Sequence, residues 1–436
     1  MPRTPPRTTH PAPGDLPFVV HEWFGNSGDP WFFALVRLRG AAPKVRDLRE
    51  LVRDRWGSVP RLRLRAGAVV PGRRRGRPRW FVSEDFEPDR YVVAAPVVPG
   101  PNALRERVGQ LLAEGIPPTR ATWRMYLLSG HEHDGFAVLL RMHHAVADGV
   151  TVIRLLERLM GAGPGTDAAA EPAGPGPAVR RVPPSRASAR GLAATAGGVL
   201  RRNSRLPFNG RIGAGRHVTW VTVSPETVRA ARRATRGGGR PTVNDVYLAA
   251  VAGALRAVAP AGPALPRRVA ALVPVNLRAT GEAARIGNVV SFFRVPLPLA
   301  ERDPGVRLAR VHAATTRAKA TGQAAIARAA IEVSARLPLR VGWFAGLVTM
   351  SAGYANTSCT NIPGPDAPLI LLGRPAIELV VAPPLMGAQG VVFGFTGLGD
   401  AFTVCVTADR THGVTADRLA EAIRVEFEEL AQTAAR

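Results

Sequence analysis

The chain has 436 residues, which is too long for one ordinary hydrophobic core and comfortable for two domains. Its two cysteines exclude a disulfide framework, and no uninterrupted apolar stretch reaches the ~20 residues needed to span a bilayer, so we expect a cytoplasmic protein. The formal net charge of +25 comes almost wholly from arginine, so anionic partners must be considered.

The N-terminal region is strongly basic. Residues 1–14 are mostly Pro, Thr and Arg without a secretory apolar segment, which predicts a disordered basic tail. A dense arginine run follows at residues 61–79. Such a run binds phosphates through counterion release, but a nucleic-acid module should also contain a reading element or interleaved aromatic residues, and neither appears. A solvated loop or a surface that attracts another anionic partner is therefore favoured over nucleic acid.

An apolar run at residues 136–142, interrupted only by Arg141, predicts a largely buried strand. The sequence His131-Glu132-His133-Asp134 precedes it. These four residues could bind a metal, but they lie between two apolar strands and have no second set of ligands. We therefore expect a solvated turn there and no metal site.

The heptapeptide at residues 143–149, His-His-Ala-Val-Ala-Asp-Gly, follows this strand directly. Apolar residues then recur at helical spacing from Val152 to Leu159, so the heptapeptide is predicted to join a strand to a helix. Asp148 stands at the helix N-cap position, Gly149 would let the backbone approach a ligand, and Gly161 would close the helix. Taken alone, a His-His pair at a strand end is more often structural than catalytic.

A composition change marks the domain boundary. Residues 161–214 are crowded with Gly, Pro, Ala, Ser and Arg, which predicts a long linker with one helix near residues 191–202. We therefore expect an N-terminal domain at 15–160 and a C-terminal domain at 215–436.

The second domain should alternate helices and strands. Helices are expected at residues 243–258 and 306–335, and strands at 268–275 and 289–297. A hairpin is expected around Gly397 and Gly399, followed by a closing amphipathic helix. Thr242 is a plausible N-cap with Asp245 at the capping-box position, and Cys359 and Cys405 are expected to be buried small hydrophobic residues.

The heptapeptide matches HHxxxDG, the signature of acyltransferases that share the chloramphenicol acetyltransferase fold. The chain resembles their wax ester synthase/diacylglycerol acyltransferase branch. Further blocks match that branch in order, at Pro241–Val246, Leu272–Arg278, Gly287-Asn288 with Ser291, and Asn361–Pro365. The resemblance implies a layered α/β fold, with two chloramphenicol acetyltransferase-like domains of mixed sheets flanked by helices, a long linker and a channel between the domains.

The resemblance also implies acyl transfer from a thioester to an alcohol without a covalent enzyme intermediate. His144 would be the general base, because an imidazole with a pKa near ~6.5 can take the hydroxyl proton and then protonate the leaving thiolate. His143 would be a packing neighbour, and Asp148 would hold the loop through a partner on the other domain. Asn244 and Asp245 are similar to the family pair that braces this loop.

Four residues are candidates for oxyanion or substrate contacts: Asn288, Ser291, Asn361 and Gln389. No cofactor is expected beyond acyl-CoA, or an acyl carrier protein, as co-substrate. The expected acceptor is a fatty alcohol or diacylglycerol, giving wax ester or triacylglycerol, and a peripheral membrane contact stays open.

Two regions depart from the family pattern, at residues 15–23 and at Ala121-Thr122-Trp123, where only the tryptophan is kept. Both regions help to shape the family's substrate pockets. A specialised-metabolite alcohol or amine therefore stays open as an alternative acceptor. A basic nucleic-acid- or membrane-binding protein is the alternative of another class.

Overall fold

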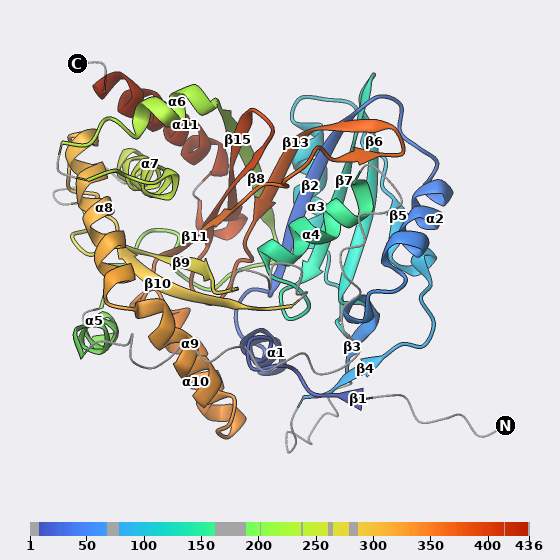
Figure 1. Cartoon of the computed structure of the whole chain (residues 1–436), viewed down its shortest axis with the longest axis horizontal. Helices are drawn as coiled ribbons and strands as arrows, with labels where there is room; N and C mark the ends of the chain where they lie inside the picture. The colour runs from blue at the N-terminus through green and yellow to red at the C-terminus, as the bar shows by residue number, and fades with distance from the viewer. Residues whose placement is uncertain are drawn as a thin grey trace.

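The computed structural model describes the chain at residues 8–67, 78–161, 189–200, 202–236, 239–259, 265–278, 287–413 and 415–434. Two six-stranded sheets, each flanked by helices, form the two halves of the molecule (Figure 1). This is the layered α/β architecture that the sequence predicts.

The first sheet has the strand order β12-β13-β2-β7-β6-β5. Its strands are β2 (Trp31–Arg39), β5 (Val92–Ala94), β6 (Trp123–Glu132), β7 (Gly135–His143), β12 (Ile370–Leu371) and β13 (Arg374–Ala382). One face packs against α2 (Val45–Trp56) and α4 (Gly149–Met160), and the other against α3 (Ala103–Ala113). Because β7 lies inside the sheet and is covered on both faces, all nine of its residues are buried, which explains its nearly continuous apolar sequence.

The second sheet has the order β10-β9-β11-β14-β15-β8. Its strands are β8 (Arg216–Val223), β9 (Ala270–Asn276), β10 (Val290–Pro296), β11 (Thr357–Ile362), β14 (Val391–Leu398) and β15 (Ala401–Asp409). One large hydrophobic core joins this sheet to four helices: α6 (Pro225–Ala231), α7 (Val243–Ala257), α8 (Pro304–Ala320) and α11 (Ala416–Thr433). Both sheets mix parallel and antiparallel pairs.

The predicted division into domains is wrong for residues 370–382. The strands β12 and β13 come from the C-terminal half of the sequence but complete the first sheet, where Ala382 of β13 pairs with Phe33 of β2 (Figure 1). The reason is the pattern of β13: Leu379 and Val381 enter the core of one face of that sheet, and Val380 enters the core of the other. Pairing with β2 buries both faces of the strand.

The prediction of a disordered tail at residues 1–14 is wrong for Thr8 and Thr9. Within the predicted disordered tail, Thr8–Thr9 form strand β1 and pair with β4 (Trp80–Val82), which pairs in turn with β3 (Leu64–Ala66). Main-chain pairing to a strand fixes residues whose composition alone indicates a tail. Helix α1 (Leu16–Trp23) follows directly.

Most other predicted elements are confirmed. The helix expected at 306–335 is two helices, α8 and α9 (Gln323–Ser334), because Gly322 adopts a left-handed φ of 68° between them. The linker contains α5 (Ala189–Leu200), close to its predicted position, and residues 162–188 lie outside the described residues. Helix α10 (Leu339–Thr349) was not predicted.

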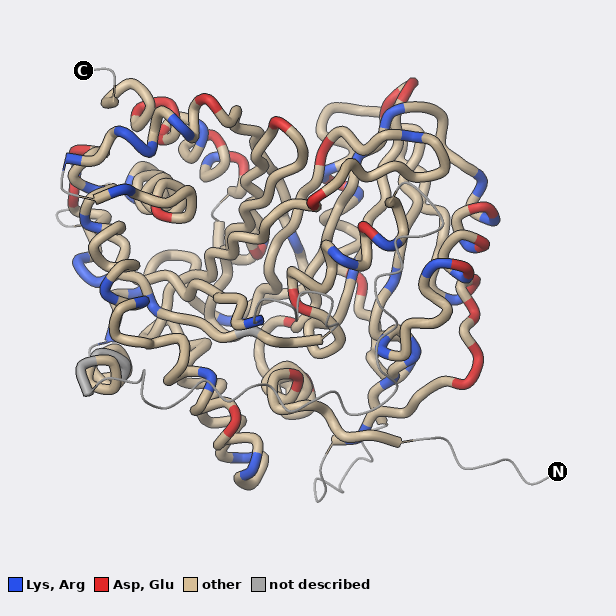
Figure 2. Tube along the Cα trace, viewed as in Figure 1, with Lys and Arg blue, Asp and Glu red and all other residues tan. Residues whose placement is uncertain are grey.

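Basic and acidic residues are mixed along the traces of both halves in Figure 2. Of the arginine run, residues 68–77 lie outside the described part of the chain. Among the described helices, none is long and apolar enough to cross a membrane.

Candidate active site

The motif loop lies between β7 and α4. Strand β7 ends at His143, and the His144 amide donates to the Pro30 carbonyl at 2.8 Å. Asp148 caps α4, since its Oδ1 accepts the Thr151 amide at 2.9 Å. The local sequence therefore presents His144 at the end of a buried strand, next to the start of a helix.

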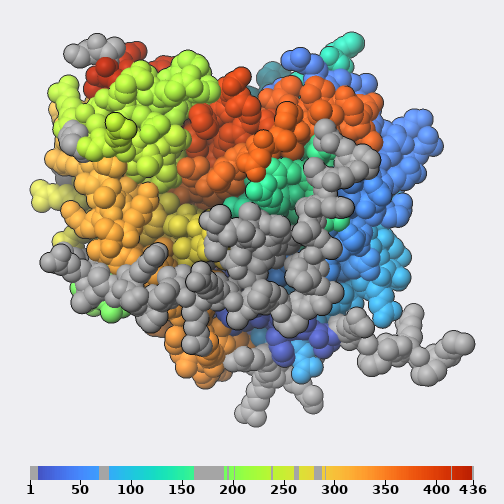
Figure 3. Space-filling model, viewed as in Figure 1, coloured from blue at the N-terminus to red at the C-terminus, as the bar shows by residue number. Residues whose placement is uncertain are grey.

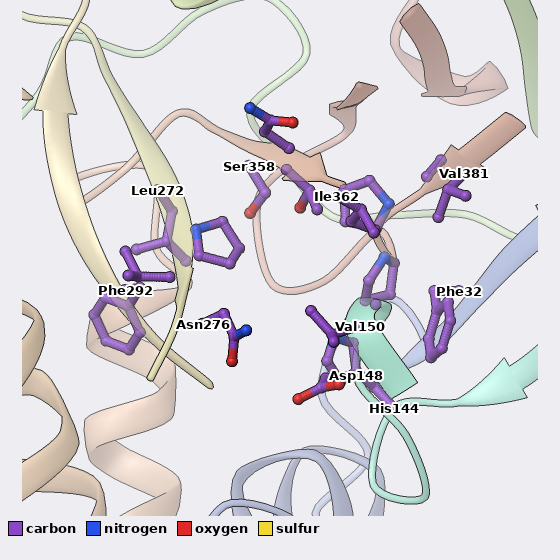
Figure 4. Close-up of a pocket in the computed structure, with 18 of the residues that line it drawn as sticks. Phe32, His144, Asp148, Val150, Leu272, Asn276, Phe292, Ser358, Ile362 and Val381 are labelled. Carbon is purple, nitrogen blue, oxygen red and sulfur yellow. The ribbon is translucent and has the colours of Figure 1, made fainter. Parts of the chain in front are cut away.

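His144 lines a cavity between the two halves of the molecule. In Figure 4, His144 and Val150 lie on one side of the cavity, with Leu272 and Phe292 opposite them. The cavity holds about 1030 Å³ of empty space, part of it open to solvent, and most of its lining is apolar. Its mostly apolar lining suits the hydrocarbon part of a ligand.

Two phenylalanines contact the His144 ring. Phe18 of α1 stacks on it with ring centroids 4.0 Å apart, and Phe32 of β2 meets it edge-on at 5.1 Å. Its Nδ1 lies 3.3 Å from Asn288 Oδ1. Burial lowers the pKa of the imidazole below its ordinary value of 6.5 and outweighs the opposite effect of the Asp148 carboxylate. The ring is therefore neutral near pH 7 and can accept a proton.

His143 is buried away from the cavity. Its Nδ1 accepts the Ala145 amide at 3.1 Å, so the proton is assigned to Nε2, which donates to Glu22 Oε2 at 2.9 Å. The side chain is 1% exposed and does not line the cavity. This histidine links the motif loop to α1.

Asp148 connects the motif loop to the second half. Its carboxylate accepts hydrogen bonds from both Nη atoms of Arg278, at 2.8 and 3.0 Å, and from the Val289 amide at 3.1 Å. Both side chains of this ion pair are at most 2% exposed. Arg278 also donates to the Gly287 carbonyl at 2.6 Å and to Thr151 Oγ1 at 3.0 Å. Asp148 therefore has the interdomain partner that the resemblance implies.

The expectation that Asn244 and Asp245 brace this loop is wrong. Asp245 completes the predicted capping box with Thr242 and accepts hydrogen bonds from His312 Nδ1 at 2.9 Å and Thr315 Oγ1 at 2.6 Å. Asn244 Oδ1 is buried without a partner among the described residues. Both residues stand in the first turn of α7. The Asp245 carboxylate takes part there in the capping box and in the contacts to α8, so it does not contact the motif loop.

Two family models match this chain. The wax ester synthase/diacylglycerol acyltransferase catalytic domain matches residues 33–202, and the C-terminal domain of the same family matches residues 286–431. The chain belongs to this family. It is therefore an acyltransferase.

Relatives and solved structures agree with this assignment. The Mycobacterium tuberculosis protein described as "Probable diacyglycerol O-acyltransferase tgs1" is 28% identical over 383 residues, covering 81% of this chain and 80% of that protein. The Marinobacter aquaeolei wax ester synthase/diacylglycerol acyltransferase has the same fold, with a TM-score of 0.67 and 20% identity over 98% of this chain and all of that one. The Fusarium sporotrichioides trichothecene 15-O-acetyltransferase TRI3 also shares the fold, with a TM-score of 0.69 and 14% identity over 97% and 95% of the two chains.

The four predicted oxyanion or substrate residues occupy different positions in this acyltransferase. Asn288 donates both amide protons to protein acceptors. Ser291 lines the cavity but donates to the Ala324 carbonyl at 2.6 Å, and Gln389 lines it while accepting from Ser358 at 2.6 Å. Asn361 lines the cavity, and no hydrogen bond to its side chain is found among the described residues.

Gly149 lines the cavity, so its predicted role, a close approach of the backbone to a ligand, stays a prediction. A Cβ at this position would lie 2.4 Å from Ile362 Cδ1 and 2.8 Å from its Cγ1. A side chain at this position would have to displace the Ile362 side chain of β11, which packs against the start of α4.

Four residues of the site were missed from the sequence: Arg278, Asp15, Phe18 and Arg61. Asp15 and Phe18 lie in the region that matches the family poorly, yet Phe18 stacks on His144 and Asp15 bonds Asn288. Arg61 belongs to the arginine run assigned to a solvated loop, but its Nε donates to the Val146 carbonyl at 2.8 Å. The sequence held a signal for three of these residues. Asp15 and Phe18 stand three residues apart at the start of a helix, and Arg278 lies within a matched family block.

The remaining candidates lie outside the site. Trp123 does not line the cavity; it is fully buried in the first core and donates to the Leu62 carbonyl at 2.9 Å. Cys359 and Cys405 are buried, and burial raises the pKa of the Cys405 thiol to about 12, so neither suits nucleophilic catalysis. Within the described residues, no group of three or more His, Cys, Asp or Glu side chains is placed to hold a metal ion.

Proposed function

We propose that this acyltransferase moves a fatty acyl group from acyl-CoA to a lipid alcohol, a fatty alcohol or diacylglycerol, with His144 as the general base. One observation carries the proposal: a neutral imidazole lines a large apolar cavity between two domains. Nδ1 is bonded to Asn288, and no hydrogen bond to Nε2 is found among the described residues. The names of the relatives support the lipid acceptor.

In the proposed reaction, Nε2 of His144 takes the acceptor's hydroxyl proton as the alcohol oxygen attacks the thioester carbonyl. The tetrahedral intermediate then collapses, the carbon–sulfur bond breaks, and the imidazolium returns the proton to the CoA thiolate. His144 is thereby regenerated. The low pKa of the ring favours both the neutral base at the start and the return of the proton at the end.

We assign the polar contact for the oxyanion to Asn361. Of the four predicted residues, Asn361 lies on the cavity wall and has a side chain with no hydrogen-bond partner among the described residues. An amide N–H directed at the developing negative charge is a typical oxyanion donor. Asn288, Ser291 and Gln389 use their polar atoms within the protein, so we assign them to positioning.

The function is tested by release of CoA thiol from long-chain acyl-CoA with a panel of acceptors, followed by mass spectrometry of the products. We expect esters with a long-chain alcohol or diacylglycerol. Faster transfer to a polar metabolite or an amine would favour the specialised-metabolite alternative, and activity with an acyl carrier protein alone would reassign the donor. No thiol release with any acceptor would refute the proposal.

The helix α10 supports a peripheral contact with an anionic membrane. None of its residues is buried, and Val341, Phe344 and Leu347 are 38–64% exposed at helical spacing. The helix lies at the lower edge of the molecule in Figures 1 and 3. No acidic residue occurs between Glu332 and Asp366, whereas Arg336 and Arg340 lie in this stretch. An apolar stripe with basic neighbours suits the surface of an anionic bilayer.

The helix α10 is also linked to His144 through contacts with α1. Trp343 on α10 donates to Asn26 Oδ1 at 2.9 Å and contacts Phe24, next to the end of α1, and α1 carries the Phe18 ring that stacks on His144. A lipid acceptor taken up at α10 would therefore enter close to the catalytic cavity.

We expect Phe344→Glu to reduce co-sedimentation with phosphatidylglycerol vesicles about tenfold, because a charge replaces the most exposed ring of the stripe. Transfer to a soluble short-chain alcohol should stay unchanged. The matched control is Val98→Glu, at a position that is 83% exposed and outside α10. Equal vesicle binding by the two variants would contradict the assignment of α10.

A further inference from the structure

We propose that Asn288 is a positioning residue that fixes the proton of neutral His144 on Nδ1, and so keeps Nε2 free as the base. The inference rests on the proposed role of His144. A neutral imidazole carries one proton on either ring nitrogen, and the Nε2–H form is favoured for a free histidine side chain in water. Two acceptors favour the other form here: the main-chain carbonyl of His144 itself and Oδ1 of Asn288.

The orientation of the Asn288 amide is determined by its partners. Nδ2 lies 2.9 Å from Asp15 Oδ1 and 2.6 Å from the His144 carbonyl oxygen. A carboxylate and a carbonyl can only accept hydrogen bonds, so both must face the NH₂ group. The Asn288 Oδ1 is thereby directed at His144 Nδ1, 3.3 Å away. Since this oxygen can only accept, Nδ1 must carry the proton.

Asp15 is itself held in place. Its Oδ2 accepts from Arg61 Nη2 at 2.8 Å, and the carboxylate is 2% exposed. The same Arg61 donates to the Ala145 carbonyl at 3.0 Å and to the Val146 carbonyl at 2.8 Å, both in the motif loop. Arg61 therefore holds the Asp15 carboxylate next to the motif loop, with Oδ1 facing the amide of Asn288.

Three distant segments thus form one chain of hydrogen bonds that ends at the His144 ring. Asp15 starts α1, Arg61 precedes β3, and Asn288 precedes β10. The amide of Asn288 contacts His144 at its carbonyl and at its ring, so it fixes both the backbone and the tautomer of this residue. A tautomer set by the partner of the second ring nitrogen is a general feature of functional histidines.

The first test is Asn288→Ala. We expect kcat to fall about tenfold or more with KM within about twofold, because substrate binding is retained while the active tautomer is depleted. The matched control is Asn209→Ala. Asn209 has the same exposed fraction of 8%, and its Nδ2 also donates to two carbonyls, those of Asn356 and Ala388, but it does not line the cavity. The control should lose stability and keep its kcat per folded molecule.

The second test reads the tautomer directly, by ¹⁵N NMR of protein labelled at histidine, with the His144→Ala spectrum used for assignment. The wild-type enzyme should show the proton on Nδ1 of His144, and Asn288→Ala should show a mixture. Asp15→Asn, which keeps the shape and removes an acceptor, should shift the tautomer in the same direction.

Two results would overturn the inference: a wild-type His144 protonated at Nε2, or an Asn288→Ala enzyme with unchanged kcat. These are distinguishable from failure of the proposed function. If His144→Ala stays active, the base is misassigned; if it is inactive while Asn288→Ala is fully active, only the positioning role fails.

Discussion

Replacing His144 with alanine is expected to lower kcat by ~10²–10⁴-fold, the usual contribution of a general base. The variant should fold, because the ring lies at the cavity wall and alanine leaves the Asp148–Arg278 ion pair intact. The measurement is thiol release with saturating acyl-CoA and a long-chain alcohol. Activity within threefold of wild type would show that the base lies elsewhere.

The pH profile of the wild-type enzyme is expected to agree with this result. Because burial lowers the pKa of His144, activity should decline only as the pH falls below 6.5, where the ring becomes protonated. The same shift lowers stability below pH 6.5, since the unfolded chain binds this proton more readily than the folded one. An acidic limb centred above pH 6.5 would contradict the assigned environment.

Replacing Arg278 with alanine is expected to lower the free energy of unfolding by ~3–5 kcal/mol and to impair acyl transfer. The change leaves the Asp148 carboxylate buried at 1% exposure without its cation, and it removes the contact between the motif loop and the second half. The measurement is urea denaturation alongside the thiol-release assay.

The control for this prediction is Arg154→Ala. Arg154 also joins two segments far apart in sequence through its pair with Asp366 at 2.9 Å, but these two side chains are 37% and 80% exposed. A solvated pair contributes about 1 kcal/mol or less, so this variant should be nearly as stable as wild type. If the two variants lose equal stability, the special role of the buried pair is refuted.

Local features of the sequence predicted much of the fold. Helix α4 with its Asp148 cap, the capping box at Thr242 and Asp245, and the β14–β15 hairpin all appear as expected. Each depends on residues within a few positions of one another, so periodicity and capping chemistry suffice. The split between α8 and α9 is also local, but a single glycine in a helical pattern does not specify whether the helix ends.

Partners far apart in sequence could not be predicted in this way. The pattern of β13 fits a buried strand, but nothing in it specifies that the strand joins the first sheet rather than the second. For Asn244 and Asp245 the sequence analysis assigned the wrong contact. A family block indicates that its residues matter, but it does not indicate which contact each residue makes. Their carboxylate and amide were assigned to the motif loop, while the fold places them at α7.

By itself, the sequence determined the family and the strand–loop–helix unit that presents His144, and the resemblance to the family implied an interdomain partner for Asp148. The tertiary structure decided that this partner is Arg278, among 58 lysines and arginines, and that Asp15 and Arg61 hold Asn288 against the His144 imidazole. The physical reason is the range of the forces involved. Helix caps and strand patterns act within one element, whereas a buried ion pair or a fixed tautomer exists only after distant segments have packed together and excluded water.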